Sequence, residues 1–217
     1  MLTVFPPSPP VLVPVAGTEQ RYPVRRIYCI GRNYLDHVKE MGNDPKADPP
    51  VFFMKPADAI VLNGRFPYPA QSADVHHEVE LVVALGPGAG IYGYAVGLDM
   101  TCRDHQAIAK EHGRPWEAAK SFDHSAPIGP ITPMQDIITR GAITLTVNGT
   151  RRQSADIAGL IWNVADMIAA LSRHAALQAG DLIFTGTPAG VGPVQIGDRM
   201  EAAIAGLGEL HVSVVKE

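Results

Sequence analysis

Short apolar runs separated by glycine, proline and asparagine recur along this chain, a pattern typical of strands rather than of long helices. The segment from Asp74 to Leu85 contains a dense aliphatic run and stops at Gly86-Pro87-Gly88, so it predicts one buried strand. A second apolar run from Ile91 to Leu98 predicts a neighbouring strand. Further strands are predicted at residues 26–30, 51–55, 59–62, 143–147 and 181–185.

Helical spacing of apolar residues is confined to a few segments. The predicted helices span residues 34–41, 101–113 and 161–177. Asn33 is a suitable N-cap for the first helix and Gly42 a suitable end, and Thr101 and Gly113 take the same positions in the second. The third helix is the longest, and we expect it to pack on a sheet as a structural element.

Two hairpins are predicted in the second half of the chain. Asn148-Gly149 separates two strand-like runs and is a preferred sequence for a type I′ turn. Residues 200–215 are expected to fold back through Gly206-Leu207-Gly208. Since predicted strands outnumber helices, we expect a mainly β, α+β fold. The proline-rich residues 1–23 predict an N-terminal arm with one edge strand near residues 11–15, and residues 24–217 predict a single domain.

The composition narrows the class of protein. A chain of 217 residues with 46% hydrophobic and 18% charged residues is long enough for one well-buried domain. A net charge of −4, a pI near 6.0 and the lack of a basic block argue against a nucleic-acid partner. No run of about 18 apolar residues occurs, so no membrane span is expected, and the proline-broken start is not a signal peptide. Cys29 and Cys102 lie in unrelated contexts, which fits the reducing cytoplasm.

Two glutamates, Glu78 and Glu80, lie one residue apart in the first predicted strand. Side chains alternate across a strand, so these two share a face and His77 points the other way. Two carboxylates this close repel each other, so they need a cation, a shared proton or open water. The simplest interpretation is a strand face exposed to solvent. Asp99, at the end of the next apolar run, can add a third carboxylate. Ligands that are all oxygen suit a hard divalent cation such as Mg²⁺, Mn²⁺ or Ca²⁺.

Candidate acid–base and anion-binding side chains occur elsewhere in the sequence. His37 and Glu40 are three residues apart on a predicted helix, so they form either a surface pair or an oriented imidazole able to activate water. Arg103 and Gln106 lie in the first turns of the second predicted helix, where an anion is favoured. Lys120 is the one cation among small residues and, without further context, predicts a surface lysine.

The glycine-rich loop from Gly186 to Gly192 offers backbone N–H groups and the Thr187 hydroxyl to an anion. It lacks the Gly-Lys-Ser/Thr ending of a nucleotide P-loop, and Gly31-Arg32-Asn33 is no dinucleotide fingerprint, so nucleotide binding is disfavoured. There is no Gly-x-Ser-x-Gly elbow, and neither cysteine has a histidine arranged beside it as in a known family. Nucleophilic catalysis is therefore weakly supported.

Seven motifs in order between about residues 24 and 215 resemble the fumarylacetoacetate hydrolase family. They are Gly31-Arg32-Asn33-Tyr34, His37-x-x-Glu40, Lys55-Pro56, His77-Glu78-Val79-Glu80, Gly97-Leu98-Asp99-Met100-Thr101-x-Arg103-Asp104, Lys120-Ser121-Phe122 and Thr185-Gly186-Thr187-Pro188. Within the family, the segments following Lys55 and at Phe66-Pro67-Tyr68-Pro69 are similar to bacterial fumarylpyruvate hydrolases of gentisate breakdown. Acylpyruvate hydrolases and oxaloacetate decarboxylases are also close. In one departure, only residues 86–90 connect two strands that relatives usually join through a short helix.

The resemblance implies a mixed β-sandwich roll that is usually a homodimer. It implies that Mg²⁺ or Mn²⁺, with Ca²⁺ as a substitute in crystals, is held by Glu78, Glu80 and Asp99. His37 with Glu40 would activate a water molecule, and Lys120 would stabilise an enolate. The side chains expected to contact substrate are Arg32, Tyr34, Arg103, Gln106 and Thr187.

The implied reaction is hydrolytic cleavage of a carbon–carbon bond in a small-molecule 2,4-diketo acid. The expected substrate is fumarylpyruvate, which would give fumarate and pyruvate. A general acylpyruvate hydrolase and an oxaloacetate decarboxylase are the alternatives. A non-catalytic metal-binding protein of the same fold is disfavoured because His37, Glu40 and Lys120 are all present.

Overall fold

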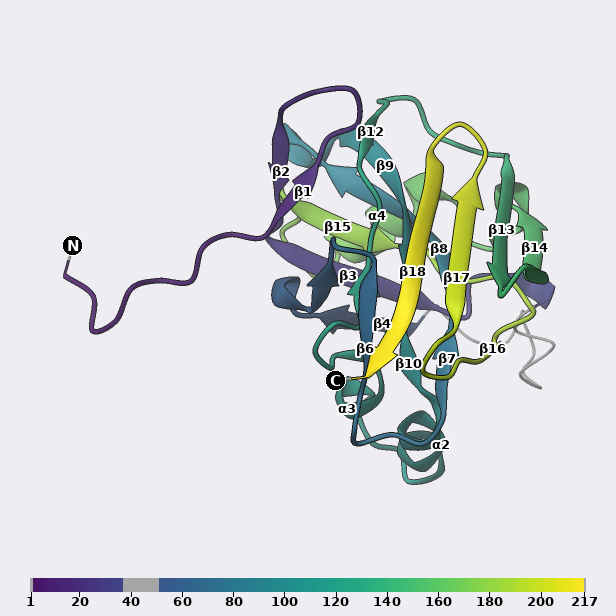
Figure 1. Cartoon of the computed structure of the whole chain (residues 1–217). Coiled ribbons are helices and arrows are strands. Elements are labelled where there is room, and N and C mark those ends of the chain that lie inside the picture. Colours follow the sequence, from purple (N-terminus) through teal and green to yellow (C-terminus); the bar gives the residue numbers. More distant parts are fainter. Residues whose placement is uncertain (1, 37–50, 217) are drawn as a thin grey trace.

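The computed structural model describes residues 2–36 and 51–216. Strands dominate these residues and the helices are few and short (Figure 1). The predicted mainly β, α+β fold is therefore confirmed. Two larger sheets carry most of the strands, and three smaller strand groups contain the rest.

The larger sheet has six strands, and β8 lies near its centre. Its order is β12 (Thr132–Pro133), β9 (Ile91–Leu98), β8 (Val79–Leu85), β15 (Asp181–Phe184), β3 (Arg26–Gly31) and β4 (Val51–Lys55). β8 pairs antiparallel with both β9 and β15, while β15 and β3 run parallel. The predicted pairing of the two apolar runs is thus confirmed. The short connection between them closes as a 3₁₀ turn, η2 (Pro87–Ala89).

The second sheet has five strands built largely from hairpins. Its order is β14 (Thr150–Asp156), β13 (Ala142–Val147), β17 (Arg199–Ile204), β18 (Gly208–Lys216) and β6 (Arg65–Tyr68). Asn148 and Gly149 both have positive φ, 51° and 76°, as the predicted type I′ turn requires. The predicted hairpin at residues 200–215 is formed by β17 and β18.

Smaller elements complete the described chain. The remaining strands are β10 (Thr101–Cys102), β7 (Val75–His77) and β16 (Gly192–Pro193) in one group, β1 (Leu12–Pro14) with β2 (Arg21–Pro23), and β11 (Ala126–Pro127) with β5 (Ile60–Val61). The helices are α2 (Arg103–Glu111), α3 (Glu117–Lys120), α4 (Val164–Ser172) and the 3₁₀ turns η1 (Ala57–Ala59) and η3 (Ile157–Gly159). Within the described residues, no helix has the length and apolar character needed to cross a membrane.

Alternation along β8 divides the core into two layers. Leu81, Val83 and Leu85 point toward the second sheet and join the larger apolar cluster there. Val82 and Ala84 point the other way, into a smaller cluster that also contains buried residues of the β1–β2 hairpin. The even-numbered face of β8, which also carries Glu80, is therefore the face away from the second sheet.

The buried strand predicted within residues 74–85 is interrupted at Glu78. β7 ends at His77 and pairs with β10 and β16, whereas β8 begins at Val79 and pairs with β9 and β15. The amide of Val79 donates to the side chain of Gln153 on β14, at 3.1 Å. Glu78 therefore lies where the chain changes from one sheet to another.

Two of the predicted helices begin later than expected. Thr101 belongs to β10 and is not a helix cap, because it pairs with His76, and α2 starts at Arg103 without a side-chain cap. α4 starts at Val164, where the side chain of Asn163 accepts from the Asp166 amide at 3.0 Å. α4 ends at Ser172, so the third predicted helix is too long at both ends. Most of the helix predicted over residues 34–41 lies outside the described residues.

Candidate active site

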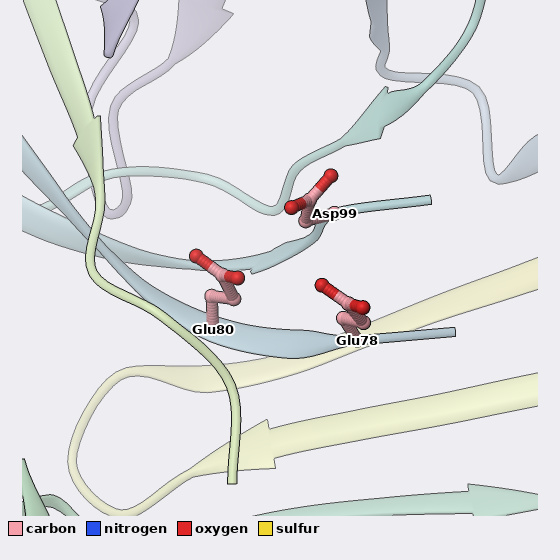
Figure 2. Close-up of side chains that lie close together, drawn as sticks. All are labelled: Glu78, Glu80 and Asp99. Carbon is pink, nitrogen blue, oxygen red and sulfur yellow. The ribbon is translucent and has the colours of Figure 1, made fainter. Parts of the chain in front are cut away.

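Three carboxylates from two neighbouring strands converge in the interior of the protein. Glu78 precedes β8, Glu80 lies on it, and Asp99 follows β9. One oxygen of each lies within 4.8 Å of an oxygen of the others, and Figure 2 shows the three side chains extending into the same space. They are 5%, 2% and 1% exposed. The alternative of a solvated strand face is therefore wrong.

The register of β8 against β9 brings the carboxylates together. Glu80 lies opposite Gly97, and the Asp99 amide donates to the Glu78 carbonyl at 2.8 Å. A Cβ at Gly97 would lie 2.6 Å from the side chain of Val82 and 2.7 Å from that of Phe184, so a larger residue would displace these buried side chains. Glycine opposite Glu80 therefore keeps this part of the sheet closely packed beside the carboxylates.

Lys120, at the end of α3, is the centre of the charged cluster. Its Nζ donates to Glu78 Oε2 at 2.7 Å, Asp99 Oδ2 at 2.5 Å and Thr101 Oγ1 at 2.6 Å. Burial by itself lowers the pKa of Lys120, but the charges of Asp99 and Glu78 outweigh burial and raise that pKa. The ammonium is therefore charged at neutral pH. The default prediction of a surface lysine is wrong, because Lys120 is 2% exposed.

A second buried lysine, Lys55, was not singled out from the sequence as a site residue. Its Nζ lies 2.8 Å from Asp99 Oδ1 and donates to the backbone carbonyls of Met100 and Lys120. Lys55 and Lys120 thus contact different oxygens of Asp99, from β4 and α3. The lysine of the Lys55-Pro56 motif fixes the position of Asp99 and helps to balance the buried negative charge.

The first turn of α2 supplies a third cation. Arg103 donates to Glu78 Oε1 and to Gln106 Oε1, both at 2.6 Å, and its Nε lies 3.3 Å from His76 Nδ1. Gln106 is buried, so its amide holds the guanidinium in one orientation. These contacts place Arg103 and Gln106 beside the carboxylates, and their role in binding substrate stays a prediction.

Glu80 is held by the glycine-rich loop. Its Oε2 accepts a hydrogen bond from the Gly186 amide at 2.8 Å. Gly186 has φ +97°, and a Cβ there would lie 2.8 Å from Asn33, so only glycine suits this approach. Burial, followed by the charges of Asp99 and Glu78, raises the pKa of Glu80 well above its ordinary value. A cation beside Glu80 would offset this cost of ionisation.

Gln153, a further residue not identified from the sequence, connects the loop to the strand break. Its amide nitrogen donates to Thr187 Oγ1 at 2.7 Å and to the Pro188 carbonyl at 2.8 Å. Its carbonyl oxygen accepts from the Val79 amide and lies 3.1 Å from His77 Nδ1. Gln153 is fully buried on β14 and therefore fixes Thr187 relative to the first residue of β8.

A cleft opens above the carboxylates, with an empty volume of about 480 Å³ that includes open solvent. The described residues that line it are Ile30, Gly31, Arg32, Phe53, Glu78, Glu80, Asp99, Arg103, Gln106, Lys110, Trp116, Lys120 and Thr187. Asp99 Oδ1 is buried and accepts no well-formed hydrogen bond from the described residues, although Lys55 Nζ is near it. Three carboxylates, of which Asp99 has a buried oxygen without a well-formed hydrogen bond, provide the oxygen ligands that Mg²⁺ and Mn²⁺ prefer.

The predicted site residues fall into three groups. Arg32, Arg103, Gln106, Thr187 and Lys120 line the cleft with the three carboxylates. Tyr34 is buried against Gly159 and is not among the described residues that line the cleft. His37 and Glu40 lie outside the described residues, so their role stays a prediction.

Residues 26–215 match the model of the fumarylacetoacetate hydrolase family, described as its C-terminal domain. That match covers most of the chain and includes the carboxylates, the buried lysines and the glycine-rich loop. The chain belongs to this family. The resemblance deduced from the seven motifs is therefore confirmed.

Relatives within the fumarylacetoacetate hydrolase family carry different names. The fumarylpyruvate hydrolase of a Ralstonia species is 42% identical over 183 residues, 79% of this chain and 95% of that protein. The oxaloacetate tautomerase YcgM of Escherichia coli is 39% identical over 199 residues, 85% and 90% of the two chains. A crystal structure of fumarylpyruvate hydrolase from Pseudomonas aeruginosa with Mn²⁺ and pyruvate superimposes over 100% of both chains, with a TM-score of 0.97 and 49% identity.

Proposed function

We propose that this protein is a divalent-metal-dependent hydrolase that cleaves a carbon–carbon bond of a 2,4-diketo acid, with fumarylpyruvate as its substrate. One observation carries the proposal most directly: Glu78, Glu80 and Asp99 meet at the floor of a small-molecule cleft with buried Lys120 beside them. The relatives named fumarylpyruvate hydrolase, one of which binds Mn²⁺ and pyruvate, support the substrate and metal.

Glu78, Glu80 and Asp99 would hold the metal. When bound, Mg²⁺ or Mn²⁺ supplies a Lewis acid for the 2-keto oxygen and a template for the keto acid. Mg²⁺ is the metal proposed for the cell.

The side chains around the carboxylates have separate tasks in the reaction. The Lys120 ammonium, whose three N–H groups donate to Glu78, Asp99 and Thr101, places a positive charge beside the oxygen on which negative charge develops as pyruvate leaves as its enolate. Arg103, held by Gln106, binds and orients the substrate carboxylate. Thr187, oriented by Gln153, and Arg32 contact the remaining polar groups of the substrate. Glu40 orients the imidazole of His37, which takes a proton from the attacking water.

Oxaloacetate chemistry is the second candidate, because relatives at 38–39% identity are named oxaloacetate tautomerase and oxaloacetate decarboxylase. The same carboxylates and Lys120 could bind a keto acid and stabilise its enolate without an attacking water. Hydrolysis and decarboxylation therefore differ in their need for His37.

A substrate comparison tests the proposal. Purified protein with Mg²⁺ or Mn²⁺ should hydrolyse fumarylpyruvate with a higher kcat/KM than acetylpyruvate and should release pyruvate. It should decarboxylate oxaloacetate more slowly. A higher kcat/KM on oxaloacetate than on both acylpyruvates would favour the second candidate instead.

The substitution His37→Ala separates the two candidates. It should lower fumarylpyruvate cleavage by about 10²–10⁴-fold, because a positioned general base contributes about that much. Oxaloacetate decarboxylation should fall much less. Equal losses in both assays would show that His37 does not activate water.

We also propose an oligomeric state, a domain organisation and a cellular location for this protein. It forms a homodimer, and each chain has an N-terminal arm, residues 1–23, followed by one catalytic domain. It acts in the cytoplasm, late in the breakdown of an aromatic compound. Cys29 and Cys102 are buried and unpaired, which supports a reducing compartment. Light scattering of the purified protein tests the dimer.

A further inference from the structure

One face of α2 lines the cleft, beginning beside the carboxylates. Arg103, Gln106 and Lys110 are spaced three and four residues apart and all line the cleft. Arg103 contacts Glu78, so this end of the helix lies at the proposed metal. Lys110 lies about 10 Å farther along the helix axis, at the rise of ~1.5 Å per residue.

Two aromatic rings form a wall between the inner and outer lysines. The Lys120 ammonium lies 5.2 Å from the centre of the Phe53 ring, and the Lys110 ammonium lies 5.5 Å from the Trp116 ring. The two rings are themselves 6.0 Å apart. Gly31 lies against Trp116, where a Cβ would be 3.4 Å from the ring. A flat, unsaturated carbon chain can lie along such a wall.

Basic side chains outnumber acidic ones around this cleft. Among the described lining residues, the three carboxylates are joined by four cations, Arg32, Arg103, Lys110 and Lys120. Desolvation, followed by the charges of Arg103 and Arg32, lowers the pKa of Lys110. A divalent metal adds further positive charge. With the metal bound, the cleft has an excess of positive charge and is therefore suited to a ligand with two negative charges.

We propose that Lys110, positioned by Trp116, binds a second carboxylate at the far end of the acyl group and so selects dicarboxylic diketo acids. This inference rests on the proposed function and names the residue that sets its acyl preference. About six carbon–carbon bonds of ~1.5 Å separate the two carboxylates of fumarylpyruvate, an extended span of ~8 Å. That span is close to the separation of Arg103 and Lys110 along α2.

A binding experiment with two probes that cannot be cleaved tests the role of Lys110. 2-Oxoheptanedioate and 2-oxoheptanoate have the same carbon chain and differ in the distal carboxylate. Calorimetry with Mn²⁺-loaded protein should show that the diacid binds about 10- to 100-fold more tightly, the range of a hydrogen bond to a charged group. Lys110→Met should remove most of this preference by weakening the diacid alone, and Lys110→Arg should keep most of it.

Arg114→Met provides the matched control, because Arg114 is an exposed cation just beyond α2 that does not line this cleft. This variant should keep the preference for the diacid. Equal binding of the two probes by the wild type, or an unchanged preference in Lys110→Met, would overturn the inference. The fumarylpyruvate assay is separate, so a failure of the proposed function would appear there and not in the binding of the probes.

Discussion

The two ends of the cleft differ in what holds their side chains in place. The inner end is the carboxylate cluster with its lysines, and the outer end is Lys110 with Trp116. At the inner end, Glu78, Glu80, Asp99, Lys55 and Lys120 are each no more than 5% exposed. Ion pairs join the two lysines to Glu78 and Asp99, and Glu80 accepts a hydrogen bond from the Gly186 amide. At the outer end, Lys110 is exposed and Trp116 is partly exposed. The inner end therefore depends on strand register and on compensated charge, whereas the outer end depends on side chains that can change at little cost to folding.

Removing one ligand at the inner end should have the largest effect. Asp99→Asn takes away a ligand charge and the partner of both buried lysines. Loss of metal-assisted stabilisation worth about 4 kcal/mol would lower kcat/KM about 10³-fold. The loss should extend to fumarylpyruvate and oxaloacetate alike. Steady-state kinetics of both reactions check this, and a loss confined to one substrate would contradict it.

Lys55→Met tests whether Lys55 supports the inner end through stability. Removing one partner of a buried ion pair costs about 3–5 kcal/mol, and the remaining contact of Lys120 with Asp99 favours the lower figure, about 3 kcal/mol. Urea unfolding in the presence of EDTA measures the change in the free energy of unfolding. A change below about 0.5 kcal/mol would show that Lys55 contributes little.

The pH dependence of stability provides a smaller test at Glu80. The pKa of Glu80 is raised in the folded protein above its ordinary value of 4.5, so the folded state retains a proton that the unfolded state has lost. In metal-free protein, the free energy of unfolding should therefore fall as pH rises above about 4.5. Glu80→Gln should reduce this fall and also weaken Mn²⁺ binding. Identical pH profiles of the two metal-free proteins would contradict this.

Substitutions at the outer end should have the smallest effect on stability. Lys110→Met and Arg114→Met change exposed side chains, so each should alter the free energy of unfolding by no more than about 0.5 kcal/mol. The same urea unfolding experiment measures both. If Lys110→Met lowered the free energy of unfolding as much as Lys55→Met does, the two ends of the cleft would not differ in their contribution to stability.

The carboxylates could be predicted from the sequence because their placement follows from local rules. Alternation puts Glu78 and Glu80 on one side, and pairing of consecutive apolar runs brings Asp99 beside them. The mainly β fold and both hairpins follow from the same alternation and from turn residues such as Asn148. These features depend on residues that are close together in the chain.

Other features depend on contacts between distant parts of the chain. Lys55 ends a strand whose preceding residue, Met54, is exposed, so nothing local indicates that its ammonium is buried against Asp99. Gln153 follows two exposed arginines on β14, yet it is fully buried. The break at Glu78 arises because β7 pairs with β16, far along the chain, and because Gln153 binds the Val79 amide.

Metal stoichiometry measured together with activity tests the central claim most directly. Protein stripped with EDTA should be inactive on fumarylpyruvate, and activity should return in proportion to bound Mn²⁺, reaching its maximum at about one ion per chain, the number that one carboxylate cluster holds. Asp99→Asn should show neither tight binding nor recovery. Full activity in the metal-free wild type, or full recovery in Asp99→Asn, would contradict the account.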